Sequence, residues 1–200
     1  QKMRDLSAFA ARRPELFADA VPADFLGQAA LGMMSHLPTR TANGELVIVL
    51  HAEKLADYAA SEYSMSDMLR FSVFYMRRMM EDERTQVHGV IMLENLANYP
   101  MFAMNKMKGA GPSGMKASFD WLGVSPLRLR GIYGCHTPWY VGMMLAMVKP
   151  FMSKKLRDRV SLHDKDTAAM LAEAGLDPKD VPPEYGGTLQ GFDYGWHLKG

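Results

Sequence analysis

Glu45-Leu-Val-Ile-Val-Leu-His51 is the stretch of sequence that decides the fold. It follows the turn Thr41-Ala-Asn-Gly44 and is short, apolar and β-branched, which predicts a strand covered on both faces. Val90-Ile-Met-Leu93 has the same character, and two further strands are predicted at Leu129-Arg-Gly-Ile-Tyr-Gly-Cys135 and around Val160-Ser-Leu-His163. Strands of this kind indicate a mostly parallel sheet with helices on its faces.

Helical segments separate these strands, as a parallel sheet requires. The longest begins at Ser64-Met-Ser-Asp67, which can cap a helix running to about Arg84. Further helices are predicted at residues 99–107, 114–122, 139–148, 153–157 and 166–174, and short ones broken by Pro14 and Pro22 at residues 5–34. The fold class is therefore α/β, with residues 1–40 as an N-terminal helical segment and residues 41–200 as the main domain.

The composition is that of a globular protein, with 48% hydrophobic and 22% charged residues. The 23 Lys and Arg residues nearly balance the 22 Asp and Glu residues, so no overall field attracts nucleic acid, and no nucleic-acid partner is expected. Cys135 is the single cysteine, which excludes an internal disulfide and favours a reducing compartment. No apolar run is long enough to cross a bilayer, so we expect a cytoplasmic protein.

Methionine is used far more often than in an ordinary protein, at 18 of 200 residues. Its side chain is flexible and polarisable, so it fills irregular cores and also lines adaptable apolar surfaces. The methionines of residues 65–80 recur at helical spacing and suit either a solid core or the wall of a pocket. Composition alone does not choose between the two.

Residues 138–152, Pro-Trp-Tyr-Val-Gly-Met-Met-Leu-Ala-Met-Val-Lys-Pro-Phe-Met, are apolar around nearly the whole circumference of the predicted helix. A core helix needs one such face, so the other face must meet something else. The basic cluster Lys154-Lys-Leu-Arg-Asp-Arg159 follows at once. An apolar helix beside a basic cluster is typical of contact with an anionic membrane surface, although a charge run alone is more often simply solvated.

The residues around each candidate catalytic motif argue against a catalytic role. Gly109-Ala-Gly-Pro-Ser-Gly114 matches GxGxxG as a string, but helical residues precede it and its proline removes an amide from the loop. Cys135 and His136 are neighbours on a strand, so their side chains point to opposite faces. The six histidines never occur at metal-ligand spacing. Glu94 can hydrogen-bond a ligand hydroxyl, but such a residue more often caps a helix or pairs with a neighbour. We therefore expect no catalytic residue, no metal and no enzyme.

Three segments taken together resemble the CRAL-TRIO lipid-binding domain family. Residues 126–138, Pro-Leu-Arg-Leu-Arg-Gly-Ile-Tyr-Gly-Cys-His-Thr-Pro, are similar to that family's strand "P..L..I...N.P". Met147-Val-Lys-Pro-Phe151 is similar to its "IKPFL" helix, and Val181-Pro-Pro-Glu-Tyr-Gly-Gly187 to its "LP.EYGG". The nearest likeness is to the α-tocopherol-transfer and retinaldehyde-binding branch. The chain departs from the pattern at Glu94-Asn-Leu-Ala97, where the family has "D.EG", and at His136-Thr-Pro138, where it has Asn-x-Pro.

The resemblance implies a sheet floor covered by helices, with residues 139–151 as a mobile lid over an apolar cavity and residues 1–40 as the remnant of a helical bundle and linker. It implies binding of a small hydrophobic ligand (tocopherol, retinoid, sterol, carotenoid or phospholipid) and its exchange at an anionic membrane surface. No cofactor other than this ligand is expected. The ligand-binding residues it implies are Met68, Phe71, Ser72, Tyr75, Met92, Trp121, Leu127, Leu129, Ile132, Tyr140, Met143, Met144, Met147 and Phe151. The phosphoinositide-contacting residues are Arg128, Lys155 and Arg159. The alternative is a lipid-sensing interaction module that transfers nothing.

Overall fold

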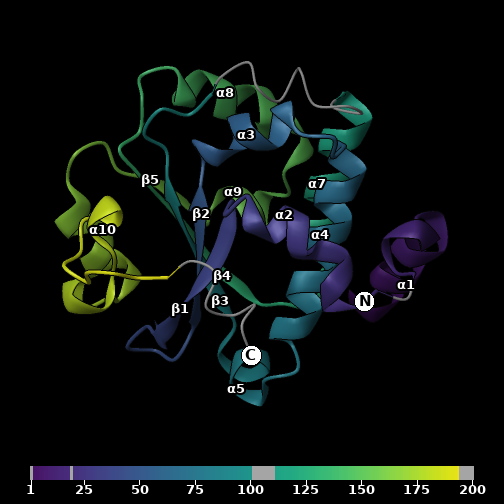
Figure 1. Ribbon diagram of the computed structural model, residues 1–200, viewed down its shortest axis with the longest axis horizontal. Coiled ribbons are helices and arrows are strands. Elements are labelled where there is room, and N and C mark those ends of the chain that lie inside the picture. Colours follow the sequence, from purple (N-terminus) through teal and green to yellow (C-terminus); the bar gives the residue numbers. More distant parts are fainter. Residues whose placement is uncertain (1, 19, 101–110, 194–200) are drawn as a thin grey trace.

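A five-stranded sheet forms the centre of the computed structural model, which describes residues 2–18, 20–100 and 111–193 (Figure 1). The strands lie side by side in chain order: β1 (Met34–Arg40), β2 (Leu46–His51), β3 (Val90–Asn95), β4 (Leu129–Cys135) and β5 (Val160–Leu162). Strands β2 to β5 run parallel, and only β1 is antiparallel to its neighbour. The predicted α/β fold with a mostly parallel sheet is confirmed.

Strand β1 was not predicted from the sequence, which placed residues 34–40 in the N-terminal helical segment. Its sequence, Met-Ser-His-Leu-Pro-Thr-Arg, has no long apolar run, so the periodicity gives no clear signal. Pro38 is exposed, and the register is irregular between His36 and Arg40. An edge strand tolerates such a proline because one side of its backbone forms no ladder.

Side chains that alternate along the buried strands divide the core into two layers. Ile48 and Met92 point to one face, and Val47 and Leu93 point to the other. Helices α4 (Met65–Met79), α7 (Pro112–Val124), α8 (Val141–Val148) and α9 (Lys154–Arg157) contribute to the first layer, and α10 (Thr167–Ala174) and η5 (Pro183–Tyr185) to the second. Figure 1 shows α10 on the opposite side of the sheet from α4 and α7.

The remaining helical elements complete the described part of the chain. They are α1 (Lys2–Arg12), η1 (Pro14–Leu16), η2 (Pro22–Phe25), α2 (Leu26–Ala30), α3 (Lys54–Ala60), α5 (Glu83–His88), η3 (Lys149–Phe151) and η4 (Pro178–Asp180). The helix predicted at residues 99–107 lies mostly outside the described residues.

Helix α4 begins where the sequence predicts but ends earlier. The Ser64 Oγ accepts a hydrogen bond from the Asp67 backbone N at 3.2 Å, and the Asp67 carboxylate accepts one from the Ser64 backbone N at 2.8 Å. This reciprocal capping fixes the start of the helix. The predicted end at Arg84 is wrong, because the Asp82 carboxylate accepts from the backbone N of Arg84 at 3.2 Å and of Thr85 at 3.1 Å. That cap begins the separate helix α5.

Strand β4 carries one extra residue relative to β3. Val90 lies opposite Leu129, and the next pair is Ile91 with Gly131, so Arg130 has no partner on β3. A bulge of this kind redirects the side chain of the extra residue. The Arg130 Nε donates to the His88 backbone carbonyl at the end of α5, at 3.0 Å.

Candidate functional site

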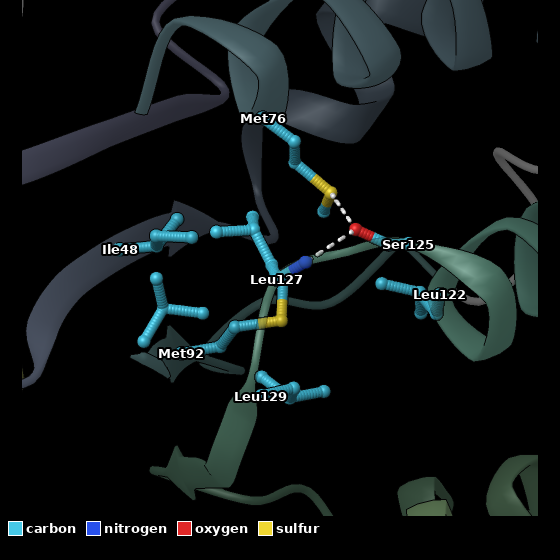
Figure 2. A pocket seen from close by; sticks show the side chains of 8 residues that line it. Ile48, Met76, Met92, Leu122, Ser125, Leu127 and Leu129 are labelled. Atoms are coloured by element: carbon cyan, nitrogen blue, oxygen red, sulfur yellow. Dashed lines mark hydrogen bonds between the residues drawn. The ribbon is translucent and has the colours of Figure 1, made fainter. Parts of the chain in front are cut away.

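The apolar layer between the sheet and helices α4 and α7 contains a small hollow with a free volume of about 10 Å³ (Figure 2). Its walls are apolar except for one hydroxyl: Ile48, Met76, Val90, Met92, Leu122, Ser125, Leu127 and Leu129. The Ser125 Oγ donates to the Met76 Sδ at 3.8 Å and accepts from the Leu127 backbone N at 3.3 Å. The cavity has room for about one water molecule, far less than the 300–1,000 Å³ or so of a typical ligand pocket.

This small cavity is not the ligand-sized apolar space that the sequence predicts beneath the lid. Three predicted floor residues, Met92, Leu127 and Leu129, do line the small cavity together. Ile132 is half-buried and packs against the same apolar cluster. Met76 and Ser125 were missed from the sequence, although Met76 follows the predicted Ser72 by four residues and so shares its helix face.

The ligand-binding residues predicted on α4 have different surroundings in the structure. Phe71 and Tyr75 are buried, but Phe71 packs against Phe25, with ring centroids 5.7 Å apart, and the Tyr75 hydroxyl lies 2.6 Å from the His36 Nδ1 on β1. Burial raises the pKa of Tyr75. Met68 packs instead with a separate apolar cluster, and Ser72 is half-buried. The rings of Phe71 and Tyr75 contact each other, with centroids 5.9 Å apart, but Met68 packs elsewhere, so the four residues do not form one wall.

Trp121 has a different place from the one predicted. Its side chain is 2% exposed and lies among the N-terminal aromatics, with its ring centroid 6.0 Å from that of Phe9 and 5.9 Å from that of Phe17. The small cavity is lined instead by Leu122 and Ser125 from the same part of the chain. Trp121 therefore packs α1 and the segment after η1 against α7 and does not line the small cavity, and its contact with a ligand stays a prediction.

Helix α8 is apolar on two faces, as the sequence predicts. Leu145 and Val148 pack against the core cluster, and Val141 is buried. Trp139, Met143 and Met147 are exposed by 87%, 54% and 69%. The structure therefore places Met143 and Met147 outside rather than in a pocket, while Met144 and Phe151 are half-buried. The helix presents one apolar face to the protein and one to its surroundings.

The start of this helix is tied to the segment after β3. The Tyr140 hydroxyl donates to the Tyr99 backbone carbonyl at 2.7 Å. Glu94, near the carboxyl end of β3, lies two residues beyond Met92 and so points to the same, helix-covered face. Its side chain is half-buried, and desolvation raises the pKa of Glu94 to about 7. Desolvation and the charge of Glu94 raise the pKa of Tyr99 to about 12.

Basic side chains gather where β4 and β5 begin. Arg128 and Lys155 are exposed and Arg159 is half-buried, and the Ile132 backbone N donates to the Arg159 carbonyl at 2.8 Å, which joins the two strands at this end. Arg130, which the sequence analysis missed, is exposed on the bulge beside them. The Arg128 Nη1 lies 3.4 Å from the Val87 carbonyl. Because β4 and β5 are parallel neighbours, Arg128, Arg130, Lys155 and Arg159 lie near the same end of the sheet, and we call these four residues the basic edge.

A second hollow, of about 360 Å³, lies between the end of α1 and the beginnings of α4 and α7. Two of its polar groups have partners: the Arg13 Nε contacts the Glu15 carboxylate at 2.5 Å, and the Ser64 Oγ donates to Asp67 at 2.6 Å. The remaining lining residues are Met65, Ser66, Leu69, Ser113, Gly114 and Ala117.

One cluster has the residue types of a hydrolytic triad. The His163 Nε2 lies 3.1 Å from both the Ser161 Oγ and the Glu173 carboxylate, and the serine also contacts the carboxylate directly, at 3.0 Å. A triad needs two different ring nitrogens for its two partners, so this arrangement does not activate the serine. Burial raises the pKa of the Cys135 thiol to about 12, which disfavours the reactive thiolate. Within residues 2–18, 20–100 and 111–193, no three potential ligands are grouped to hold a metal ion.

The fold and site define a class of protein: an open α/β sheet with an apolar, methionine-rich face, a two-faced apolar helix above it and a basic edge. The chain belongs to the CRAL/TRIO domain family, whose model matches residues 33–187. This is a family of lipid-binding and lipid-transfer proteins. In the described part of the chain, no helix combines the length and apolar character needed to cross a membrane.

Curated relatives agree with this assignment. The chain is 29% identical to Clavesin-2 of Homo sapiens over 153 residues, which cover 76% of this chain and 44% of the relative. It is 28% identical to Clavesin-1 of Rattus norvegicus over 165 residues, 82% of this chain and 44% of the relative. The chain thus spans less than half the length of these relatives. The crystal structure of Sfh5 has the same fold, with a TM-score of 0.65, 12% identity, and coverage of 96% of this chain and 66% of that chain.

Proposed function

We propose that this protein binds one small, lipid-like molecule between α8 and the sheet and exchanges it at an anionic membrane surface, without catalysis. The single observation that carries the proposal is helix α8, which packs Leu145 and Val148 on the core and exposes Trp139, Met143 and Met147. An apolar outer face costs free energy in water unless it meets an apolar environment for part of its working cycle.

The ligand would enter by displacing α8 and repacking the methionines beneath it. The small cavity of about 10 Å³ cannot take a lipid, so the layer must open first. Met76, Met79 and Met92 suit this, because an unbranched thioether can change conformation at little cost. A ligand that buries roughly 400 Å² of apolar surface gains about 10 kcal/mol before the costs of association and ordering. That gain leaves micromolar to nanomolar affinity within reach.

Glu94 is the polar group best placed to select the ligand. It lies on the helix-covered face of the sheet, half-buried, and its pKa of about 7 allows it to accept a hydrogen bond as carboxylate or to donate one as acid. We propose that it contacts a hydroxyl on the ligand. Tocopherols, retinoids and sterols offer such a group, whereas carotenoids often do not, and phospholipids bring a charged headgroup that the apolar walls would not favour.

The basic edge would hold the protein on the membrane while α8 opens. Arg128, Arg130, Lys155 and Arg159 all lie near the start of β4 and β5, and Lys154 and Arg157 on α9 are exposed. Each basic side chain near an anionic surface contributes about 1 kcal/mol, and clusters of this size bind phosphoinositides and phosphatidylserine. The protein would then work from the cytoplasm and touch membranes transiently.

The decisive experiment is solvent extraction and native mass spectrometry of the purified chain, followed by a transfer assay between vesicles with a fluorescent tocopherol or retinoid. Bound lipid and transfer that is faster to anionic vesicles support the proposal. Bound lipid with no transfer supports the alternative, a lipid-sensing interaction module. A chain that takes up no hydrophobic probe even in the presence of anionic vesicles overturns both.

A further inference from the structure

We propose that the hydrogen bond from the Tyr140 hydroxyl to the Tyr99 backbone carbonyl is a latch that holds α8 closed. The inference rests on the proposed function, in which α8 is the lid. It assigns to Tyr140 a role in controlling exchange in place of the ligand contact that the family resemblance implies.

The position of the bond at one end of the helix suits it for this role. Tyr140 is the N-cap residue of α8, and its hydroxyl reaches the Tyr99 carbonyl, 41 residues earlier in the chain, at 2.7 Å. Within the described residues, this is the one side-chain hydrogen bond that joins residues 139–148 to another element. Val141, Leu145 and Val148 add apolar contacts between α8 and the described part of the protein.

The other end of the segment is held differently and can serve as the hinge. Met152 is buried at 7% exposure and follows η3, and the Arg157 Nη1 lies 3.5 Å from the Lys149 carbonyl. The near end is held by the Tyr140 hydrogen bond and by Val141, which is 9% exposed, so loss of the hydrogen bond leaves one small apolar contact there and favours opening at this end. Trp139 and Tyr140 are adjacent there, with ring centroids 5.8 Å apart, so a membrane that takes up Trp139 pulls directly on the latch.

The strength of this hydrogen bond suits a contact that forms and breaks readily. A neutral hydrogen bond of this kind changes an equilibrium by roughly two- to tenfold, because opening exchanges it for a bond to water. Tyr140→Phe keeps the ring and its packing and removes only the donor. We expect the open population to rise by that factor, with ligand affinity falling by no more than the same factor.

Labelling of a thiol beneath the helix measures the opening directly. Leu145→Cys places a thiol on the inner face of α8, and Cys135 is buried on the other face of the sheet, so it adds only a slow background. The labelling rate with a maleimide is compared between Leu145→Cys alone and Leu145→Cys with Tyr140→Phe. The matched control is Leu145→Cys with Tyr99→Phe, which removes a neighbouring hydroxyl but keeps the carbonyl that accepts the bond.

A two- to tenfold faster reaction with Tyr140→Phe, and an unchanged rate with Tyr99→Phe, support the latch. Equal rates in the presence and absence of the Tyr140 hydroxyl overturn it, as does equal acceleration by both substitutions. The readout needs no ligand. If the latch result holds and no lipid binds, the lid moves but the proposed function fails; if lipid transfers and the labelling rates are equal, only the latch fails.

Discussion

Removal of the Trp139 side chain tests the outward role of α8 most directly. The side chain is 87% exposed. An aromatic side chain presents roughly 150–250 Å² of surface, so about 130–220 Å² of Trp139 meets water. Full transfer of that area to hydrocarbon gives roughly 3–5 kcal/mol, and immersion of about half of it in the membrane interface gives about 2 kcal/mol. Trp139→Ala should therefore weaken partition onto vesicles by about 30-fold.

The assay is sedimentation with vesicles that contain phosphatidylserine, with the partition coefficient measured against lipid concentration. Trp139→Ala should change Tm by no more than about 2 °C, because an exposed side chain contributes little to folding. Leu26→Ala is the matched control, since Leu26 is an apolar residue on α2 with 51% exposure. The reasoning is refuted if Trp139→Ala partitions as well as the parent chain, or if Leu26→Ala loses as much.

Three further results are expected. Lys155→Ala combined with Arg159→Ala should slow transfer to anionic vesicles by about ten- to thirtyfold, because each charge contributes about 1 kcal/mol. Ligand affinity should stay nearly unchanged. An equal loss of transfer rate and ligand affinity would contradict a role of the basic edge in membrane contact. Because burial raises the pKa of Glu94 to about 7 from an unfolded value near 4.5, the folded state binds more protons between these values. Stability should then fall by about 3 kcal/mol as pH rises from 4.5 to 7 and level off above, and urea unfolding of Glu94→Gln should lose this slope. Trp121→Ala should lower the free energy of unfolding by about 3–5 kcal/mol and expose α1 to proteolysis; cleavage at the parent rate would show that Trp121 does not anchor it.

Local patterns in the chain were sufficient to predict the buried strands and helix α8. Residues 46–50 and 90–93 are apolar without alternation, which is typical of a strand covered on both faces, so the parallel sheet followed from them. The apolar circumference of residues 139–148 likewise predicted a helix with two apolar faces. Strand β1 could not be read in this way, because Pro38 and the irregular register leave it without periodicity, and only pairing with β2 makes it a strand.

The sequence by itself determined which residues are apolar, where strands β2 to β5 and helix α4 begin, and which family pattern the chain follows. Only the tertiary structure decided which side of α8 faces water, that Trp121 meets Phe9 and Phe17, and that the Tyr140 hydroxyl reaches Tyr99. The physical reason is that hydrophobic periodicity indicates which side chains are buried but not which residues they contact. The packing of elements that are distant in the sequence decides which buried side chains come into contact. It also decides how much volume remains between them.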